Sequence, residues 1–292
     1  MEYLIHIGIV LGLYMILVAS AQLVIGHARL ISLGQGAFFG TGAYVTALCM
    51  LNLGWSFFPA LLAAVVLNAV IGLLLALPAV RLKGDYFVLT TLGFQFIIFQ
   101  LTVNLDGLTG GPAGLGGIPS PATPQFLPLS QSGYLFVVTV VLVIIAFAAL
   151  FLLQKSRFGR NLKALCDHEL LYEISGRSPI KLRAQVIAVS AATTAMASGV
   201  YAVYMSYLAP GSFNLDQSIF ILTGVMLGGL SRLRQAVTGA LVIVLFPELM
   251  RTMGLPATYG PSLNQVFFGL VLLVLVSFTV VKRFQSNERQ NQ

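Results

Sequence analysis

The sequence predicts an all-α fold, that of a polytopic membrane protein with about nine transmembrane helices, its N-terminus outside and its C-terminus in the cytoplasm. Three observations support this prediction. Of the 292 residues, 58% are hydrophobic and 9% are charged, whereas an ordinary soluble domain has about 25% charged residues. The apolar residues form runs of about 20, the length of a helix that crosses a bilayer. The basic residues fall in alternate loops between these runs.

This composition excludes several classes of protein. Nine acidic and 16 basic residues are too few to cover the surface of a soluble chain of this length, which excludes a cytosolic enzyme and a secreted disulfide scaffold. The net charge of +7 does not indicate nucleic-acid binding, because the basic residues lie between apolar runs. Neither Cys49 nor Cys166 lies in a CxxC motif, and the three histidines are far apart. We therefore expect no metal site and no cofactor.

The predicted spans follow one another in a single transmembrane domain that covers residues 1–292. The first has no basic segment before it, so we expect it to be retained and not cleaved as a signal peptide. The second is rich in glycine, which predicts a break or bend, and the seventh and eighth are short, which favours half-helices. The spans are 3–25, 34–52, 59–80, 86–104, 134–153, 184–207, 217–230, 236–250 and 263–281.

The most polar loop, residues 155–183, fixes the predicted orientation. It carries seven basic residues, so the positive-inside rule places it in the cytoplasm. Alternation from this loop puts 15 of the 16 basic residues on the cytoplasmic side and leaves only Arg251 outside. A wrong number of spans would have scattered the basic residues over both sides. The distribution of charge therefore supports the topology.

The longest external loop, residues 105–133, has a different character. Asp106 is its only charged residue, and it contains five prolines among several glycines. Such dense proline and glycine punctuation predicts a turn-rich, compact loop without a helix. We expect no separate soluble domain.

The chain lacks the motifs by which a transporter would itself use ATP or an ion gradient. It contains no GxxxxGK[ST] loop for ATP and no HExxH or GxSxG motif. Its carboxylates Asp85, Asp106, Asp216 and Glu248 all fall at the ends of predicted spans, where ion-coupled transporters do not place a proton or sodium site. The sequence therefore favours a translocation subunit that a partner drives and that is not itself an enzyme. The alternatives are an uncoupled channel or facilitator and a purely structural membrane subunit.

Residues 160–175 are predicted to form one amphipathic helix within the cytoplasmic loop, ended by a glycine. A helix lying on the membrane surface favours a basic polar face, whereas this one becomes acidic toward its end. Docking into a groove on a protein partner suits it better, and Leu165→Asp is then predicted to weaken binding of that partner. The residues expected to carry this coupling are Arg160, Leu162, Leu165, Asp167, Glu169, Glu173 and Gly176.

Polar side chains within the apolar spans are candidates for a substrate pathway. A polar group in a span must face protein or water and not lipid. Glycine pairs at i and i+4, such as Gly36 and Gly40, allow helices to approach closely, and in residues 34–42 they are interleaved with polar side chains. The candidate pathway residues are Gln35, Thr41, Thr90, Thr91 and Gln95.

Four segments together resemble the permease family of branched-chain amino acid ABC importers, the LivM type. The segment 156–160 with the following helix and Gly176 resembles the coupling-helix segment of ABC importer permeases. The glycine-rich segment 32–44, the segment 81–92 and the external segment 108–119 resemble the family's other motifs, and the likeness extends over about residues 5–280. The chain departs from the pattern at Ser231 and Arg232 and at residues 193–198. These departures bear on the identity of the substrate and on how closely the helices pack.

The resemblance implies an assembly in the inner membrane of a bacterium. Its members would be a sister permease as heterodimer partner, two cytoplasmic ATPase subunits and an external substrate-binding protein, surrounded by membrane lipid and without nucleic acid. It implies branched-chain or related small amino acids as substrates; urea, amides or another small solute remain alternatives. It also makes the external loop a candidate contact for the binding protein. The alternative is that these residues serve only the folding of the loop itself. The residues concerned are Thr109, Gly110, Gly111 and Gly114.

Overall fold

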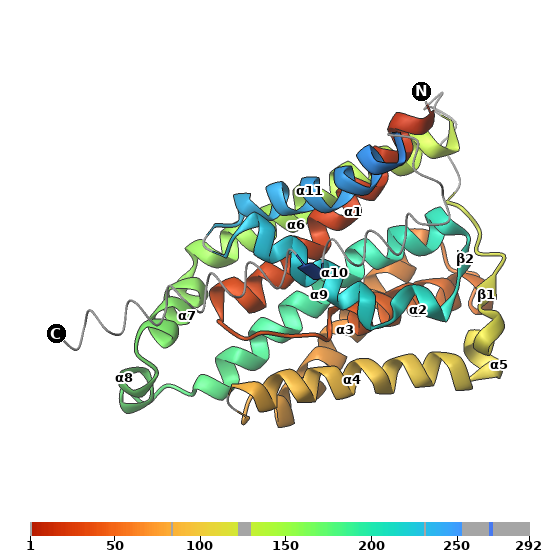
Figure 1. The fold of residues 1–292 in the computed structure, drawn as a ribbon. Helices are drawn as coiled ribbons and strands as arrows, with labels where there is room; N and C mark the ends of the chain where they lie inside the picture. The colour runs from red at the N-terminus through yellow and green to blue at the C-terminus, as the bar shows by residue number, and fades with distance from the viewer. Residues whose placement is uncertain (1, 83, 122–129, 231, 253–268, 271–292) are drawn as a thin grey trace.

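The computed structural model describes residues 2–82, 84–121, 130–230, 232–252 and 269–270. Helices make up most of these residues (Figure 1). They are α1 (Glu2–Gln22) with the π-helical turn η1 (Leu23–His27), α2 (Gln35–Asn52), α3 (Phe57–Ala79), α4 (Asp85–Asn104), α5 (Asp106–Thr109), α6 (Gln131–Lys155), α7 (Arg157–Asp167), α8 (Glu169–Ile174), α9 (Pro179–Met205), α10 (Leu215–Gly228) and α11 (Arg234–Thr252). The remaining elements are the 3-10 turns η2 (Gly111–Ala113) and η3 (Pro210–Phe213) and the strands β1 (Leu115–Gly116) and β2 (Tyr207–Leu208).

Five of the described helices are long and apolar enough to cross a bilayer: Glu2–His27, Phe57–Ala79, Asp85–Asn104, Gln131–Lys155 and Pro179–Met205. The 14 residues of α10 give a helix of about 21 Å, shorter than the ~30 Å of a hydrocarbon core. The predicted span 263–281 lies outside the described residues except for 269–270. The number nine and the orientation of the termini stay predictions.

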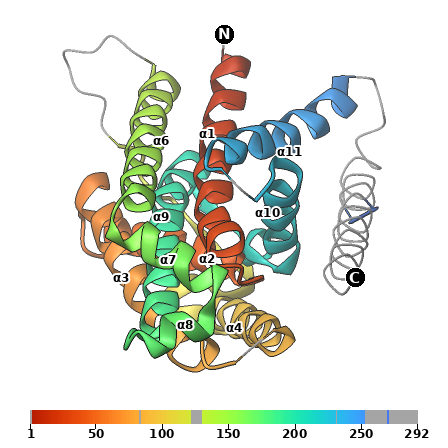
Figure 2. The same ribbon diagram turned by 90° about the vertical axis from the view of Figure 1, so that its left-hand side faces the viewer.

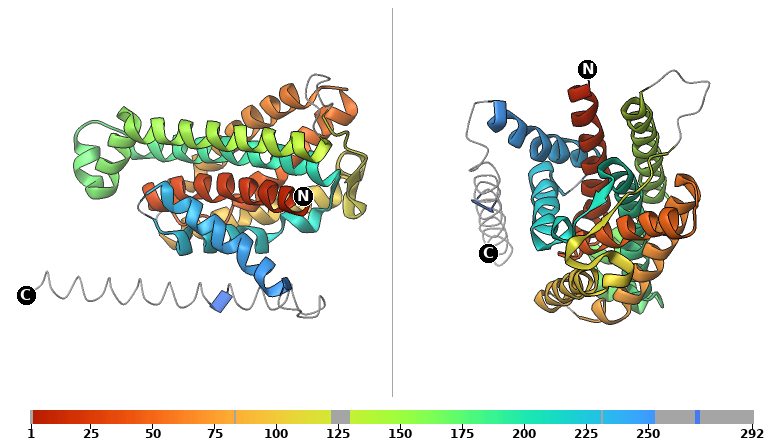
Figure 3. Two further views of the ribbon diagram at one scale, coloured as in Figure 1. Left: turned by 90° about the horizontal axis from the view of Figure 1, so that it is seen from above. Right: turned by 90° about the vertical axis from the view of Figure 1, so that its right-hand side faces the viewer.

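Successive long helices run back and forth between two ends of the bundle (Figures 1 and 3). At one end lie α7 and α8, and at the opposite end lie α5 and the antiparallel pair of β1 with β2. Arg29 after η1 bonds to Cys166 of α7, and Gln22 of α1 bonds to the backbone of Arg232 before α11. Three basic segments therefore gather at the α7 end, which we call the cytoplasmic end in keeping with the predicted topology.

The core is organised around α9, which packs on α1, α2 and α3. It is rich in alanine, serine and threonine and contains Gly199, and such small residues let neighbouring backbones come close. A Cβ atom on Gly72 of α3 would lie 2.9 Å from Ala191 Cβ and 3.1 Å from Ala188 Cα. The central helix is thus held by small-residue contacts, the packing mode of membrane bundles.

The outer surface is apolar where α3 and α6 face away from the core. A soluble protein rarely exposes large contiguous apolar surface, so this pattern supports a membrane-embedded fold. The exposed side chains include Leu62, Val66, Leu74 and Leu77 of α3 and Val141, Ile144, Ile145 and Leu152 of α6.

The glycine-rich segment 34–52 is not broken within its span. Residues 35–52 form the uninterrupted helix α2, and the break lies before it, at Gly34. The glycines serve close packing instead, because a Cβ atom on Gly42 would lie 2.1 Å from Ser198 Oγ and 2.6 Å from Asn68 Nδ2. The expectation of a break inside this span was therefore wrong.

The external loop also differs from its prediction. It contains one helical turn, α5, and the 3-10 turn η2, where no helix was expected. Asp106 stands in the first turn of α5, where a negative charge favours the helix dipole, and Gly110 ends the turn in the left-handed region at φ 74°. Proline and glycine limit the length of these turns without preventing them.

Close packing of α10 on α11 provides the first testable prediction. A Cβ atom on Gly239 would lie 2.0 Å from the Gly224 carbonyl oxygen, a backbone atom that cannot move aside. Gly239→Ala should therefore lower the free energy of unfolding by about 1–3 kcal/mol, the usual cost of overpacking. Thermal unfolding of the detergent-solubilised chain measures this. Gly93→Ala is the control, because nothing lies within 4 Å of that position; equal losses in both variants would contradict the packing argument.

Candidate functional site

A buried polar junction joins the N-terminal ends of α2 and α10 to the middle of α4. The Gly36 amide donates a hydrogen bond to Ser218 Oγ at 2.8 Å. Ser218 Oγ donates to Gln95 Oε1 at 3.1 Å, and Gln95 Nε2 donates to the Phe213 carbonyl at 2.7 Å. The side chains of Gln95 and Ser218 are each 1% exposed. We call Gly36, Gln95, Phe213 and Ser218 the polar junction.

The polar junction lies at mid-depth in the bundle. Gln95 is ten residues beyond Asp85, the first residue of α4, which corresponds to about 15 Å along the helix, half of a hydrocarbon core. Irregular backbone at such depth is tolerated where protein or a water-filled cavity surrounds it. Helix N-termini also carry partial positive charge and amide groups without helical partners. Two such ends meeting at mid-depth resemble the broken-helix sites of transporters.

Residues 28–34 return from η1 to the polar junction as a re-entrant segment. Thr91 of α4 holds this segment, because its Oγ1 accepts a hydrogen bond from the Leu33 amide at 3.1 Å. The Ser32 hydroxyl accepts from the Gly34 amide at 3.3 Å. Side-chain partners therefore hold the backbone just before α2, while the amides of Ala28 and Leu30 bond to backbone carbonyls of η1.

A second buried network ties α1, α2 and α9 together beside the polar junction. Gln35 Nε2 donates to Ser190 Oγ at 2.9 Å, and Thr194 Oγ1 donates to Gln35 Oε1 at 3.1 Å. Ser190 Oγ in turn donates to the Ser20 carbonyl at 2.8 Å. All four residues are buried. A network whose members are all partnered fixes a unique helix arrangement.

The structure brings together three of the five predicted pathway residues. Gln35, Thr91 and Gln95 surround the start of α2 and are 1–2% exposed. Thr41 lies farther along α2, where its hydroxyl donates to Asn68 Oδ1 at 2.5 Å. Thr90 is not part of this group, because its hydroxyl bonds to the Tyr86 carbonyl on a helix face where Tyr86 is 68% exposed.

Sequence reasoning missed several members of this site. Ser218 and Asn68 are polar residues in apolar helices, and that signal could have found them. The carbonyl of Phe213 takes part through its backbone, which no sequence pattern indicates. An aromatic cluster also adjoins it, with ring centroids of Phe39 and Tyr44 5.4 and 5.7 Å from that of Phe213.

The cytoplasmic helix predicted over 160–175 is two helices, α7 and α8, so the prediction of one helix was wrong. His168 separates them with extended backbone at φ −148° and ψ 90°. The turn lets Glu169 reach Arg183 at the start of α9, with both carboxylate oxygens 3.0 Å from guanidinium nitrogens. It leaves Leu162 and Leu165 of α7 packed in the core of their own chain, each 2% exposed.

The remaining predicted coupling residues lie at the surface of this helix pair. Arg160 is exposed and bonds to the Lys155 carbonyl, and Glu173 is exposed on α8. Gly176 ends the segment in the left-handed region at φ 77°. Three large apolar side chains of α8 point away from the core, which we call the α8 surface: Leu170 (71% exposed), Leu171 (61%) and Ile174 (74%).

Direct contacts join α7 to the re-entrant segment. Arg29 Nη1 donates to the Cys166 carbonyl at 2.8 Å and its guanidinium lies 3.8 Å from the Asp167 carboxylate. Cys166 Sγ donates to the His27 carbonyl at 3.0 Å. Because residues 28–34 continue into α2, a movement of α7 would reach the polar junction through few intervening residues.

The four candidate contact residues of the external loop have structural roles. Thr109 is 4% exposed, and its hydroxyl lies 2.8 Å from the Thr102 carbonyl. Gly110, Gly111 and Gly114 all have positive φ, between 56° and 77°, and Gly114 packs against the Leu208 carbonyl. The exposed residues in the part of this loop that the structure describes include residues 105–108, Pro112, Ala113, Gly116, Gly117 and Pro119. Among the described residues no group of three or more His, Cys, Asp or Glu could hold a metal ion.

Comparison with known proteins identifies similar chains. The chain is 31% identical over 261 residues to the high-affinity branched-chain amino acid transport system permease protein LivM of Escherichia coli (strain K12), an alignment that covers 82% of this chain and 61% of that relative. It is 28% identical over 232 residues to a probable LivM of Methanocaldococcus jannaschii, covering 75% of this chain and 65% of the relative. This chain therefore spans less than two thirds of the length of these LivM relatives.

A second group of relatives carries a different name. The autoinducer 2 import system permease protein LsrC of Salmonella typhi is 27% identical over 277 residues, which cover 90% of this chain and 74% of that protein. No solved structure matches the chain. The family model described as "Branched-chain amino acid transport system / permease component" matches residues 3–276. The chain therefore belongs to the family of branched-chain amino acid transport system permease components.

Proposed function

We propose that this chain is the membrane subunit of an ATP-driven importer for branched-chain or related small amino acids. The observation that carries the proposal is a connected path: the exposed α8 surface, the contacts of α7 with Arg29 and His27, and the polar junction at the end of the re-entrant segment. The chain has no GxxxxGK[ST] motif of its own. A path of this kind would connect ATPase subunits, which are separate from this chain, to the polar junction in its interior.

In the proposed mechanism, one of the two ATPase subunits binds the α8 surface of this chain from the cytoplasm and the other binds the sister permease. Closure of the ATPases on ATP moves α8 and α7, and α7 pulls the re-entrant segment through Arg29 and His27. The start of α2 then separates from the start of α10, and the hydrogen bonds around Gln95 break. ATP shifts the balance between these two states because the ATPases contact the closed and open forms differently.

The polar junction has chemistry suited to an amino acid. In the open state the freed Gly36 amide at the start of α2 would face a carboxylate, which helix N-termini attract. The freed oxygens of Gln95 and Phe213 would accept hydrogen bonds from the ammonium group. The rings of Phe39, Tyr44 and Phe213 would contact an aliphatic side chain.

A small neutral solute such as urea or an amide is the second candidate substrate. It is favoured by the polar junction, whose side chains carry no charge, and by the likeness to permeases named for autoinducer 2. Competition against labelled leucine separates the candidates. Excess isoleucine and valine should abolish leucine uptake, and excess urea or acetamide should leave it unchanged.

Reconstitution tests the proposed function itself. The chain would be placed in vesicles with a sister permease, ATPases and binding protein co-expressed from the same source, and labelled leucine uptake would be measured with and without ATP. Accumulation should require ATP, the ATPases and the binding protein together. Uptake by the chain alone down a gradient would instead support a facilitator, and no uptake under any condition would support a structural subunit.

The half-buried thiol of Cys166 reports on the proposed movement of α7. Burial raises the pKa of this thiol, and nearby Arg29 and Arg183 lower it by less. A raised pKa means less thiolate at a given pH, so Cys166 should react with iodoacetamide more slowly than glutathione at pH ~7.5, and its rate should keep rising above the usual thiol pKa of ~8.5.

The labelling experiment uses a Cys49→Ala background, which leaves Cys166 as the single cysteine. Mass spectrometry of the modified chain gives the rate. In the assembled transporter, a non-hydrolysable ATP analogue should accelerate labelling if α7 leaves His27. Labelling as fast as glutathione in the resting chain would contradict the buried environment, and an unchanged rate with nucleotide would contradict the α7 movement.

A further inference from the structure

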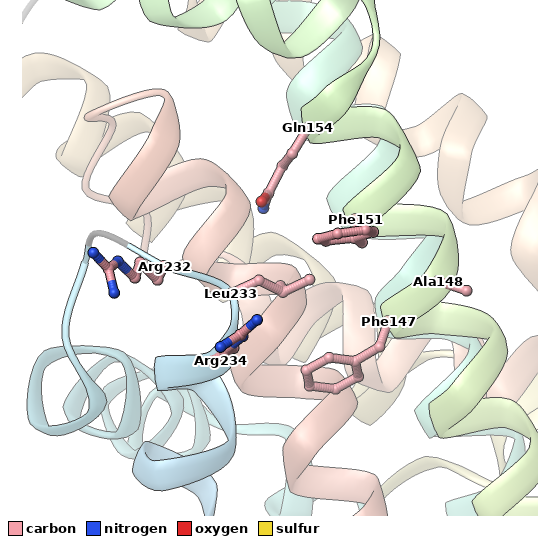
Figure 4. A pocket seen from close by; sticks show the side chains of 7 residues that line it. All are labelled: Phe147, Ala148, Phe151, Gln154, Arg232, Leu233 and Arg234. Carbon is pink, nitrogen blue, oxygen red and sulfur yellow. The ribbon is translucent and has the colours of Figure 1, made fainter.

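A groove of about 590 Å³ opens on the outside of the bundle near its cytoplasmic end (Figure 4). Phe147, Phe151 and Gln154 of α6 line one side, and Arg232, Leu233 and Arg234 line the other side at the start of α11. Helix α1 lies between α6 and α11 and packs on both (Figure 2). The groove has the size of a site for a small molecule.

The groove combines positive charge with an apolar wall. The guanidinium groups of Arg232 and Arg234 form no ion pair with any residue that the structure describes, and both side chains are exposed. Lys155 adds a third cation, since its Nζ lies 4.3 Å from the centre of the Phe151 ring. No acidic side chain is among the described lining residues. Such a groove is complementary to an anion that also has an apolar part.

Gln154 provides an unpaired hydrogen-bond donor beside the groove. Its Nε2 atom is buried and has no hydrogen-bond acceptor among the described residues. Leaving a buried amide donor unpaired costs free energy, so buried donors are nearly always satisfied. The side chain extends from α6 toward the groove (Figure 4). An oxygen of a bound molecule would satisfy it.

The apolar wall continues the surface of α6 that faces away from the core. Ile144 and Ile145, which lie farther along α6 from its end at Lys155, are 61% and 49% exposed. Phe147 lies eight residues before Lys155, the last residue of α6, or about 12 Å deeper along the helix. The groove thus begins at the level of the basic residues and runs down into the apolar part of the bundle.

We propose that this groove binds an anionic phospholipid of the cytoplasmic leaflet. Its phosphate would contact Arg232 and Arg234 and accept a hydrogen bond from Gln154 Nε2, while an acyl chain would lie against Phe147 and Phe151. A free phosphate would leave the apolar wall uncovered, and basic pockets at the cytoplasmic side of membrane proteins suit acidic headgroups. The site lies apart from both the polar junction and the α8 surface.

Native mass spectrometry of the purified full-length chain in detergent tests the proposal. Dioleoyl phosphatidylglycerol and dioleoyl phosphatidylcholine would be titrated separately, and the bound fraction would be counted. The anionic lipid should bind at least tenfold tighter. Removing a cation near an acidic headgroup weakens binding about fivefold, so Arg232→Gln with Arg234→Gln should weaken phosphatidylglycerol binding about 30-fold and leave phosphatidylcholine binding unchanged.

The control variant, Arg157→Gln with Arg177→Gln, removes two charges from another basic surface at the same end, around α7. It should retain tight phosphatidylglycerol binding, and Gln154→Leu should lose part of it. Thermal unfolding checks that each variant is folded. Three results would overturn the proposal: equal binding of the two lipids, equal loss in the control variant, or competition by inorganic phosphate alone at the affinity of the lipid. Exclusion of lipid by a sister subunit in the assembled transporter would also overturn it.

Discussion

Replacing Leu170 and Ile174 of the α8 surface by aspartate is expected to abolish association with the ATPase subunits. The two side chains are 71% and 74% exposed on the short helix α8, which the predicted topology places in the cytoplasm, and large exposed apolar side chains there mark an interaction site. Loss of an apolar anchor at a protein interface costs about 2 kcal/mol or more, which is about 30-fold in affinity. Co-purification of the ATPases and ATP-dependent uptake should both be lost.

The controls for this experiment separate docking from folding. Leu170→Met with Ile174→Met keeps the surface apolar and should keep the ATPases bound. Ser175→Asp places one negative charge, half of that in the double variant, on the exposed residue that follows α8 and should have little effect. If the ATPases still co-purified with the double aspartate variant at the wild-type level, α8 would not be their docking site.

This surface was only partly predictable from sequence. Helical periodicity correctly marked Leu162 and Leu165 as an apolar face, but periodicity does not say whether such a face is covered by a partner or by the same chain. In the structure both side chains are 2% exposed. Leu165→Asp would therefore damage the packing of α7 itself, and the test of docking belongs on α8. The break at His168, which creates α8, accompanies the tertiary ion pair between Glu169 and Arg183, and periodicity carries no signal for such a pairing.

For the fold and the polar junction too, some features were predictable from the sequence and others arise only from tertiary packing. Long apolar runs predicted most of the described helices, because a helix that crosses a bilayer must be mostly apolar and about 20 residues long. Gln35, Thr91 and Gln95 are buried, in keeping with the rule that polar groups in a span avoid lipid, and their place in a substrate pathway stays a prediction. Their partners were not predictable, because Ser218 lies 123 residues from Gln95 in the sequence and only the packing of α10 on α2 and α4 joins them. For the same reason Thr90 and Thr91 could not be told apart.

Gln95→Leu is expected to reduce ATP-driven uptake at least tenfold. The leucine side chain has a similar volume but cannot hydrogen-bond, so the Phe213 carbonyl loses its donor and the Ser218 hydroxyl loses its acceptor. Each unpaired buried group costs about 1–3 kcal/mol, and the closed contact between α2 and α10 should loosen. Uptake in reconstituted vesicles measures the effect, and co-purification of the ATPases should stay at the wild-type level because the α8 surface is untouched.

Gln100→Leu is the matched control, because the same substitution then falls on an exposed position of the same helix. It should retain uptake if the buried hydrogen bonds, and not the polarity of α4 in general, are what transport needs. A Gln95→Leu variant that unfolds would show a lower melting temperature than Gln100→Leu, so thermal unfolding distinguishes a lost gate from a lost fold. A stable Gln95→Leu chain with full uptake would remove the polar junction from the transport path, while leaving the α8 surface as a docking site that serves a pathway elsewhere in the assembly.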